Sequence, residues 1–395
     1  MNKVIKVIGI VSTGLLLTTG CSFIGTKANT SSNSTSSVSA TKLSNNGDVD
    51  YNDIFTERDL KQVVDTSDAT TYKVSDNKDI TITKEGVYVI KGSAKNVSII
   101  INAEDSAKVQ LVLDDLNITN DSSPCIYVKS ADKVFVNLVG DNSLSVTGTF
   151  TSDGDTNTDA VIFSKEDIVI NGTGSLDIES SDNGISSKDD LKITGGDITI
   201  NCVSDGLEAN DSVAIADGSI TINSNKDGIH AEYDEDDTVG YVYIKDGTIN
   251  INASDDAIHA TTYVRIDNGT INLNSREGIE GTYITINGGT ININASDDGI
   301  NGGQKSRFMT VGVEINGGDI TIDMGQGDTD AIDSNGNLYI NGGTLTINAQ
   351  SPFDYDGEAK YTSGTMIING EETTTITNQF AGGQGGPGGG RDYRR

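Results

Sequence analysis

The stretch ITINGGTININASDDGI, residues 284–300, decides the fold. Its apolar residues alternate with polar ones in short runs, and Gly and Asn separate the runs. Such alternation predicts short β-strands, and Gly, Asn and Asp favour the turns between them. From Asp167 onward the chain repeats this pattern as V-x-I-x-G-G-T-I-x-I-N-x-x-x-D-G-I-x-A, with an uninterrupted spacing of 21 or 22 residues. The chain is therefore a repeat protein.

Each repeat holds three short strands, which predicts an all-β, right-handed parallel β-helix with coils of about 21–22 residues. A leucine-rich repeat would need its own leucine series and a helical return, and a propeller blade would need roughly twice the period. Two insertions, Glu232–Gly240 and Gly303–Gly312, follow the G-I-x-A step and leave the same corner of the helix. The Asn after each I-x-I predicts a structural ladder of amides.

Four segments organise the chain: a signal peptide at 1–21, a Ser/Thr/Asn-rich tether at 22–50, the β-helix at 51–376 and a Gly-rich tail at 377–395. The charged start and short apolar run of the first segment are typical of secretion signals. The run ends at Cys21 in a sequence that resembles a lipobox, so we expect an extracellular protein anchored to the cell membrane by a lipid on Cys21. Ordinary cleavage and release is the alternative.

Residues Asp53–Val64 carry an Asp cap and apolar side chains at helical spacing. An open end of a β-helix exposes unpaired strand edges, so we expect a short helix here to cap the first coil.

Charge excludes one class of partner. With a net charge of −31 the chain lacks the basic surface that nucleic acid requires, and a divalent cation is the natural partner. Cys125 and Cys202 lie about three coils apart, too far for a disulfide, so we expect two buried free thiols in a monomer.

Acidic residues recur at the D-G-I step and three positions later, so carboxylates of successive coils should stack about 5 Å apart and repel one another. Hard oxygen ligands and only two His favour Ca²⁺ over Zn²⁺. Solvated turn residues without a metal are the alternative. The candidate Ca²⁺ ligands are Asp205, Glu208, Asp227, Glu232, Asp255, Asp256, Glu277, Glu280, Asp297, Asp298, Asp330 and Asp333.

A second column is aromatic. Tyr241, Tyr263 and Tyr283 occupy one position on three successive coils, and Tyr243 and Arg265 share their outward face. This strip could stack sugar rings and pair a uronate carboxylate, or could serve as a structural ladder.

The chain resembles carbohydrate-binding domain proteins of anaerobic Gram-positive bacteria, which have a β-helix similar to polysaccharide lyases. The resemblance covers about residues 51–376 and rests on FTERDL at 55–60, VQLVLD at 109–114, IYVKSADKV at 126–134 and ASDDGI at 295–300. It implies Ca²⁺ sites between coils and binding of cellulose-like or uronic-acid-containing polysaccharide without general catalytic activity.

Three functions stay open at this point: a non-catalytic polysaccharide-binding protein, a Ca²⁺-dependent lyase and a structural surface stalk. A lyase needs a basic side chain over the acids to abstract a proton. The candidate bases are Lys226, Lys245, Arg265, Arg276, Lys305 and Arg307. Only Arg276, directly before Glu277, lies inside the acidic column.

Overall fold

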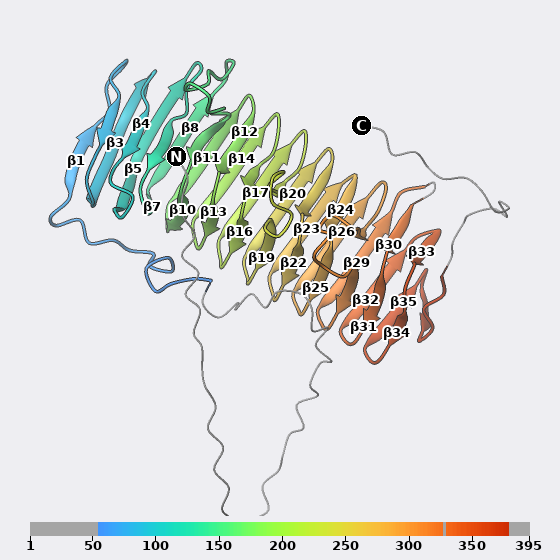
Figure 1. Ribbon diagram of the computed structural model, residues 1–395. Helices are drawn as coiled ribbons and strands as arrows, with labels where there is room; N and C mark the ends of the chain where they lie inside the picture. Colours follow the sequence, from blue (N-terminus) through green and yellow to red (C-terminus); the bar gives the residue numbers. More distant parts are fainter. Residues whose placement is uncertain (1–53, 327–328, 379–395) are drawn as a thin grey trace, which may run out of the picture. The chain divides into compact units, whose positions relative to one another are not determined.

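The computed structural model describes residues 54–326 and 329–378. The signal peptide, Cys21, the tether and nearly all of the Gly-rich tail lie outside the described residues. Every regular element within them is a strand, in one sheet of 12 strands and one of 24. The strands stack from β1 to β35 in chain order (Figure 1). The expected all-β coil is confirmed. No helix of the described residues is long and apolar enough to cross a membrane.

Three faces make up the stack. The 12-stranded sheet contains β2 (Ile80–Ile82), β4 (Ile99–Asn102), β6 (Ile126–Ser130), β9 (Ala160–Ser164), β12 (Asn183–Ser187), β15 (Leu207–Ala209), β18 (Ile229–Ala231), β21 (Asp256–Ala260), β24 (Glu277–Gly281), β27 (Ile300–Gly302), β30 (Asp330–Ser334) and β33 (Ser351–Tyr355). We call it the acidic face, because the predicted carboxylates lie on its strands or within three residues of them.

The larger sheet forms the other two faces. One, the tyrosine face, contains β1 (Thr70–Lys73), β3 (Gly86–Lys95), β5 (Lys108–Asn120), β7 (Lys133–Val139), β10 (Asp167–Gly172), β13 (Asp190–Ile193), β16 (Ser212–Ile215), β19 (Tyr241–Ile244), β22 (Tyr263–Ile266), β25 (Tyr283–Ile286), β28 (Gly312–Ile315), β31 (Asn337–Ile340) and β34 (Ala359–Tyr361). The other, the asparagine face, contains β8 (Asp141–Val146), β11 (Ser175–Ser180), β14 (Asp197–Cys202), β17 (Ser219–Ser224), β20 (Thr248–Ala253), β23 (Thr270–Ser275), β26 (Thr290–Ala295), β29 (Asp319–Met324), β32 (Thr344–Asn348), β35 (Thr365–Ile368) and the antiparallel β36 (Glu371–Thr373).

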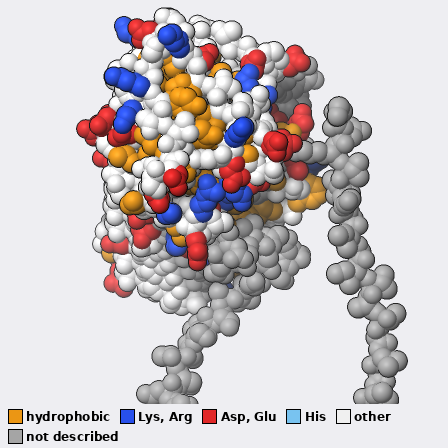
Figure 2. Space-filling model, turned by 90° about the vertical axis from the view of Figure 1, so that its left-hand side faces the viewer, with side chains coloured by type: hydrophobic (Ala, Val, Ile, Leu, Met, Phe, Trp, Pro, Cys, Tyr) orange, Lys and Arg blue, Asp and Glu red, His pale blue; other side chains and the backbone are white. Residues whose placement is uncertain are grey.

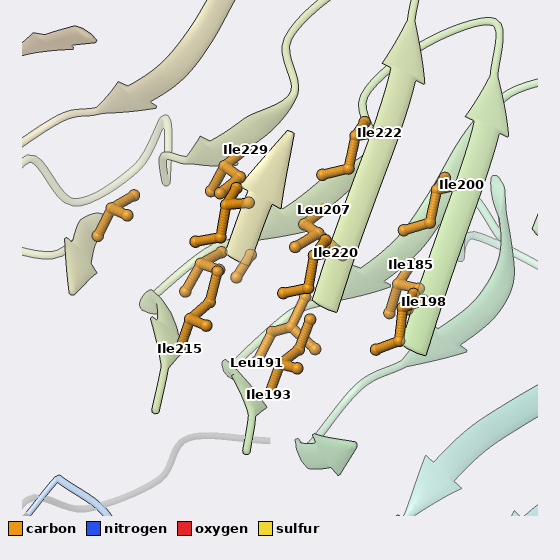
Figure 3. Packing of buried hydrophobic residues seen from close by; sticks show 14 of the residues in the cluster. Ile185, Leu191, Ile193, Ile198, Ile200, Leu207, Ile215, Ile220, Ile222 and Ile229 are labelled. Carbon is orange, nitrogen blue, oxygen red and sulfur yellow. The ribbon is translucent and has the colours of Figure 1, made fainter. Parts of the chain in front are cut away.

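Inward-facing aliphatic side chains fill the space between the faces. Ile198 and Ile200 pair in register with Ile220 and Ile222 of the next coil. Leu207 reaches the same interior from the acidic face (Figure 3). All five side chains are fully buried. Stacked β-branched ladders therefore replace the single large core of an ordinary globular domain.

Amide ladders run along the outside. Asn223 Nδ2 donates to Asn201 Oδ1 at 2.8 Å, and Asn252 Nδ2 donates to Asn223 Oδ1 at 2.9 Å. These bonds confirm the predicted Asn column on the asparagine face. Cys125 and Cys202 are free and buried, as expected.

The predicted N-terminal helix is wrong. Residues 54–62, which we call the strap, form one turn and then run along the tyrosine face. The carbonyl of Ile54 accepts a hydrogen bond from Lys192 Nζ at 2.9 Å, and that of Gln62 accepts one from Asn137 Nδ2 at 3.0 Å. Because the sheet's side chains bond the strap's carbonyl groups, an i→i+4 helical ladder does not form.

The strap also does not cap the first coil. It crosses the middle of the tyrosine face, from Tyr243 on β19 to Asn137 on β7. Figure 2 looks onto the β1 end of the stack, where hydrophobic side chains lie among charged ones. Tyr72 and Tyr88 stack there with ring centroids 6.3 Å apart.

Candidate functional site

The carboxylates of the D-G-I step line up on the acidic face as expected, and part of their role is structural. The backbone N–H of Asp227 donates to Asp205 Oδ1 at 2.9 Å, and the N–H of Asp256 donates to Asp227 Oδ1 at 2.9 Å. The N–H of Asp330 likewise donates to Asp298 Oδ1 at 3.2 Å. One oxygen of each acceptor thus fixes the adjacent coil, and the second can pair with a cationic side chain or an ion.

Lysine side chains pair with several acids of the column. Lys226 Nζ lies 3.2 Å from Asp205 Oδ2, and Lys305 Nζ lies 2.7 Å from Glu280 Oε1. Lys188 Nζ lies 3.4 Å from Glu208 Oε1. Lys side chains therefore supply positive charge to these acids, and bound Ca²⁺ stays a prediction.

Arg276 holds the middle of the column together. Its guanidinium lies 2.6 Å from Asp255 Oδ1, 2.8 Å from Glu277 Oε1 and 2.6 Å from Asp297 Oδ2. Burial opposes its charge, but the hydrogen bond to Asp255 and the charge of Glu277 raise the pKa of Arg276 above its ordinary value. It is a fixed cation rather than a proton acceptor.

The C-terminal part of the column differs. In the described ranges no ion pair reaches Asp298 or Asp333. Burial, together with the charge of Asp333, raises the pKa of Asp298 to about 8. Burial and the charge of Asp354 raise the pKa of Asp333 to about 7. Carboxylates that are crowded in this way favour a proton or a divalent cation between them.

Two histidines interrupt the acids. His230 on β18 pairs in register with His259 on β21, and their rings stack with centroids 4.8 Å apart and an angle of 15°. Glu232, at the start of the first insertion, places Oε2 3.2 Å from His230 Nε2 and 3.7 Å from His259 Nε2. The sequence showed both His positions but not that the rings would stack.

The two insertions meet over the coils that separate them. Arg307 Nε of the second lies 2.8 Å from Asp237 Oδ2 of the first, although 70 residues separate them in the chain. Between the insertions and the tyrosine face lies a pocket of about 560 Å³. Its lining is Asp190, Asp211, Thr238, Val239, Tyr241, Thr262, Tyr263, Ser306, Phe308 and Met309.

Aromatic and apolar groups form part of this pocket. Tyr241 and Tyr263 stack with centroids 5.5 Å apart, and Phe308 of the second insertion is 64% exposed. Asp190 and Asp211 add carboxylates, and Thr262 and Ser306 lie on polar positions of the lining. The sequence placed the two insertions at one corner, but their lengths gave no sign of a shared pocket.

The expected exposed tyrosine strip is wrong as a surface. Tyr243, Tyr263 and Tyr283 point away from the core as predicted, yet each is at most 9% exposed. Phe55 of the strap packs on Tyr243 at 6.0 Å, and Tyr283 Oη donates to Glu314 at 2.7 Å. Only Tyr241 and Tyr263 reach the pocket.

Arg265 is already engaged. Its Nε lies 2.8 Å from Asp267 Oδ1, and its Nη2 lies 3.1 Å from Asp267 Oδ2. The Asp267 carboxylate thus already takes up the two guanidinium N–H groups that a uronate carboxylate would need.

Comparison with known proteins gives the family. The family model described as carbohydrate-binding domain-containing protein matches residues 76–329 and 274–381. A protein of that description from Acetivibrio thermocellus is 38% identical over 128 residues, which are 31% of this chain and 45% of the relative. The match thus spans about half the length of the relative.

A solved structure, described as the polysaccharide lyase-like protein from C. thermocellum in a gadolinium derivative, is 28% identical to this chain. The comparison has a TM-score of 0.46 and covers 73% of this chain and 98% of that one. The family model covers well over half of the 395 residues, and the chain therefore belongs to the carbohydrate-binding domain-containing family.

Proposed function

We propose that the protein binds polysaccharide without cleaving it, in the pocket between the two insertions and the tyrosine face. The pocket carries the proposal, because it brings stacked aromatic rings together with hydroxyl and carboxylate groups. Aromatic faces pack on the apolar faces of sugar rings, and polar side chains bond the sugar hydroxyls. The family's description supports the same class of ligand.

The charge of the pocket favours neutral glycans. Asp190 and Asp211 line it, and the whole chain carries a net charge of −31. Their carboxylates accept hydrogen bonds from sugar hydroxyls but repel a uronate. A polymer that contains uronic acids should therefore bind this pocket more weakly than a neutral one. We place Ca²⁺ separately, on the crowded acids around Asp298 and Asp333.

The protonation of the basic side chains favours a binding protein over a lyase. A lyase needs a neutral base above the acids. For Lys226 and Lys305, burial opposes the charge, but Asp205 and Glu280 respectively raise their pKa values above the ordinary value. Together with Arg276, these side chains stay protonated at neutral pH.

The test is titration of neutral β-glucan and of polygalacturonate oligosaccharides by calorimetry, each with Ca²⁺ and with EDTA. Phe308→Ala should weaken binding of the neutral glycan by about 1–2 kcal/mol, roughly 5- to 30-fold in Kd, because an exposed aromatic contact is lost. Tyr241→Ala should do the same.

Tyr339→Ala is the matched control, since Tyr339 lies on the same face at β31 outside the pocket lining. It should bind like the wild type. Equal affinity of the Phe308 and Tyr241 variants and the wild type would refute the pocket as the binding site. Cleavage of polygalacturonate, with the appearance of an unsaturated product, would refute the non-catalytic role.

A further inference from the structure

We propose that His230, His259 and Glu232 form a binding site for a divalent transition-metal ion, with Zn²⁺ as the probe. This site would be separate from the Ca²⁺ site proposed around Asp298. The three side chains offer ligand atoms that all lie within 4.8 Å of one another.

Carboxylates hold the Nδ1 atom of both rings. His230 Nδ1 lies 2.5 Å from Asp227 Oδ2, and His259 Nδ1 lies 3.1 Å from Asp256 Oδ2 and 2.7 Å from Glu280 Oε2. Carboxylates that hold Nδ1 fix the ring of a metal-binding His and leave Nε2 for the ion. Both Nε2 atoms are turned toward the same oxygen, Glu232 Oε2.

The spacing of the ligand atoms fits as well. Zn²⁺ binds His nitrogen and carboxylate oxygen at about 2.0–2.2 Å, so two tetrahedral ligands are separated by roughly 3.3 Å. The distances from Glu232 Oε2 to the two Nε2 atoms are 3.2 and 3.7 Å. The rings stack nearly parallel, so at least one of them would have to rotate for both Nε2 lone pairs to point at the ion.

A second observation points to a ligand. His259 is only 8% exposed, and its Nε2 is buried without a hydrogen-bond partner. Buried polar atoms are nearly always satisfied, so an exception calls for an occupant. The buried nitrogen faces Glu232, on the side where the ion would lie.

The donor set selects the class of metal. Two imidazoles and one carboxylate suit Zn²⁺, Co²⁺ or Ni²⁺, whereas Ca²⁺ prefers six or more oxygen atoms. Glu232 is 39% exposed, so the fourth position can take water from the solvent. The surrounding carboxylates, including Asp227 and Asp256, add a negative potential that attracts a cation.

Protons compete with a metal ion for the two imidazole rings. Burial opposes the charge on both rings, but Asp227 and Glu232 raise the pKa of His230 to about 10, and Asp256 and Glu280 raise that of His259 to about 9. Without a metal, both rings are thus protonated and lie between carboxylates. A metal ion must displace the protons on Nε2 to bind.

The experiment is calorimetric titration of the full chain with Zn²⁺ in millimolar Ca²⁺, without glycan, and absorption spectroscopy with Co²⁺. We expect one Zn²⁺ per chain and a tetrahedral Co²⁺ spectrum. His259→Asn and Glu232→Gln should each weaken Zn²⁺ by at least about tenfold. Asp298→Asn is the control and should leave Zn²⁺ affinity unchanged.

Melting curves in EDTA would show that the variants are folded, and Glu232→Gln is the safer variant because its side chain is on a partly exposed insertion. Absence of Zn²⁺ binding at micromolar concentrations would overturn the proposal. So would equal affinity of the wild type and both ligand variants, or loss of binding in Asp298→Asn. Since no glycan is present, failure here is independent of the polysaccharide proposal.

Discussion

Asp298 shows how one side chain links the fold to pH. Its Oδ1 accepts the N–H of Asp330 on the next coil, while burial and Asp333 raise its pKa to about 8. An unfolded Asp titrates near pH 3.9, so between about pH 4 and pH 8 the folded state binds more protons than the unfolded one. Stability without metal should therefore fall as the pH rises through this window.

We expect the melting temperature in EDTA to fall between about pH 5 and pH 8.5, and Asp298→Asn to make this fall shallower because the titrating group is removed. Thermal unfolding monitored by circular dichroism checks this. Asp177→Asn, an exposed position on β11, is the control and should keep the wild-type slope. A slope that Asp298→Asn leaves unchanged would argue against this assignment.

The residue pattern predicted which acids share a column, because the repeat spacing sets the register. It did not predict their compensation. Lys305 lies in an insertion, whose path the repeat does not dictate, and its contact with Glu280 is visible only in three dimensions. The burial of Tyr243 escaped prediction for a similar reason, since the strap that covers it comes from a distant part of the chain.

Among the elements, the strap departs furthest from expectation. Ile54 and Phe55 pack on the tyrosine face, whereas Leu60 is 40% exposed and Val63, directly after the strap, is 72% exposed. Local spacing alone cannot distinguish a helix from an extended segment that buries a few side chains. The strands were predictable because each repeat supplies the same evidence again.

Ile54→Ala should lower the free energy of unfolding by about 2 kcal/mol, because a buried side chain is removed from its contact with Tyr243 and Ala214. Val63→Ala removes an exposed side chain and should change it by less than about 0.5 kcal/mol. Urea unfolding followed by circular dichroism measures both. Equal effects of the two substitutions would mean that the strap is not held by this contact.

At the scale of the whole molecule, the net charge of −31 opposes the compact state through self-repulsion. The chain offsets part of it with internal cations such as Arg276, and leaves the acids around Asp298 crowded. A ligand that binds only the folded state stabilises it by mass action.

Millimolar Ca²⁺ should therefore raise the melting temperature relative to EDTA, and the double substitution Asp298→Asn and Asp333→Asn should remove most of this increase. Mg²⁺ should act more weakly, because it requires a stricter octahedral geometry. Differential scanning calorimetry gives the shift. Superimposable curves with Ca²⁺ and EDTA would contradict a calcium site in the fold.

The path of the strap has a consequence for a mechanical pull on the chain. The chain joins the described body near β19, in the middle of the stack, and its bonds from Ile54 to Gln62 lie along the tyrosine face. A pull on the N-terminal side would reach these bonds one after another, starting at Ile54, before it stressed the coils. We therefore expect a pull to detach the strap from the tyrosine face while the stacked coils keep their hydrogen bonds.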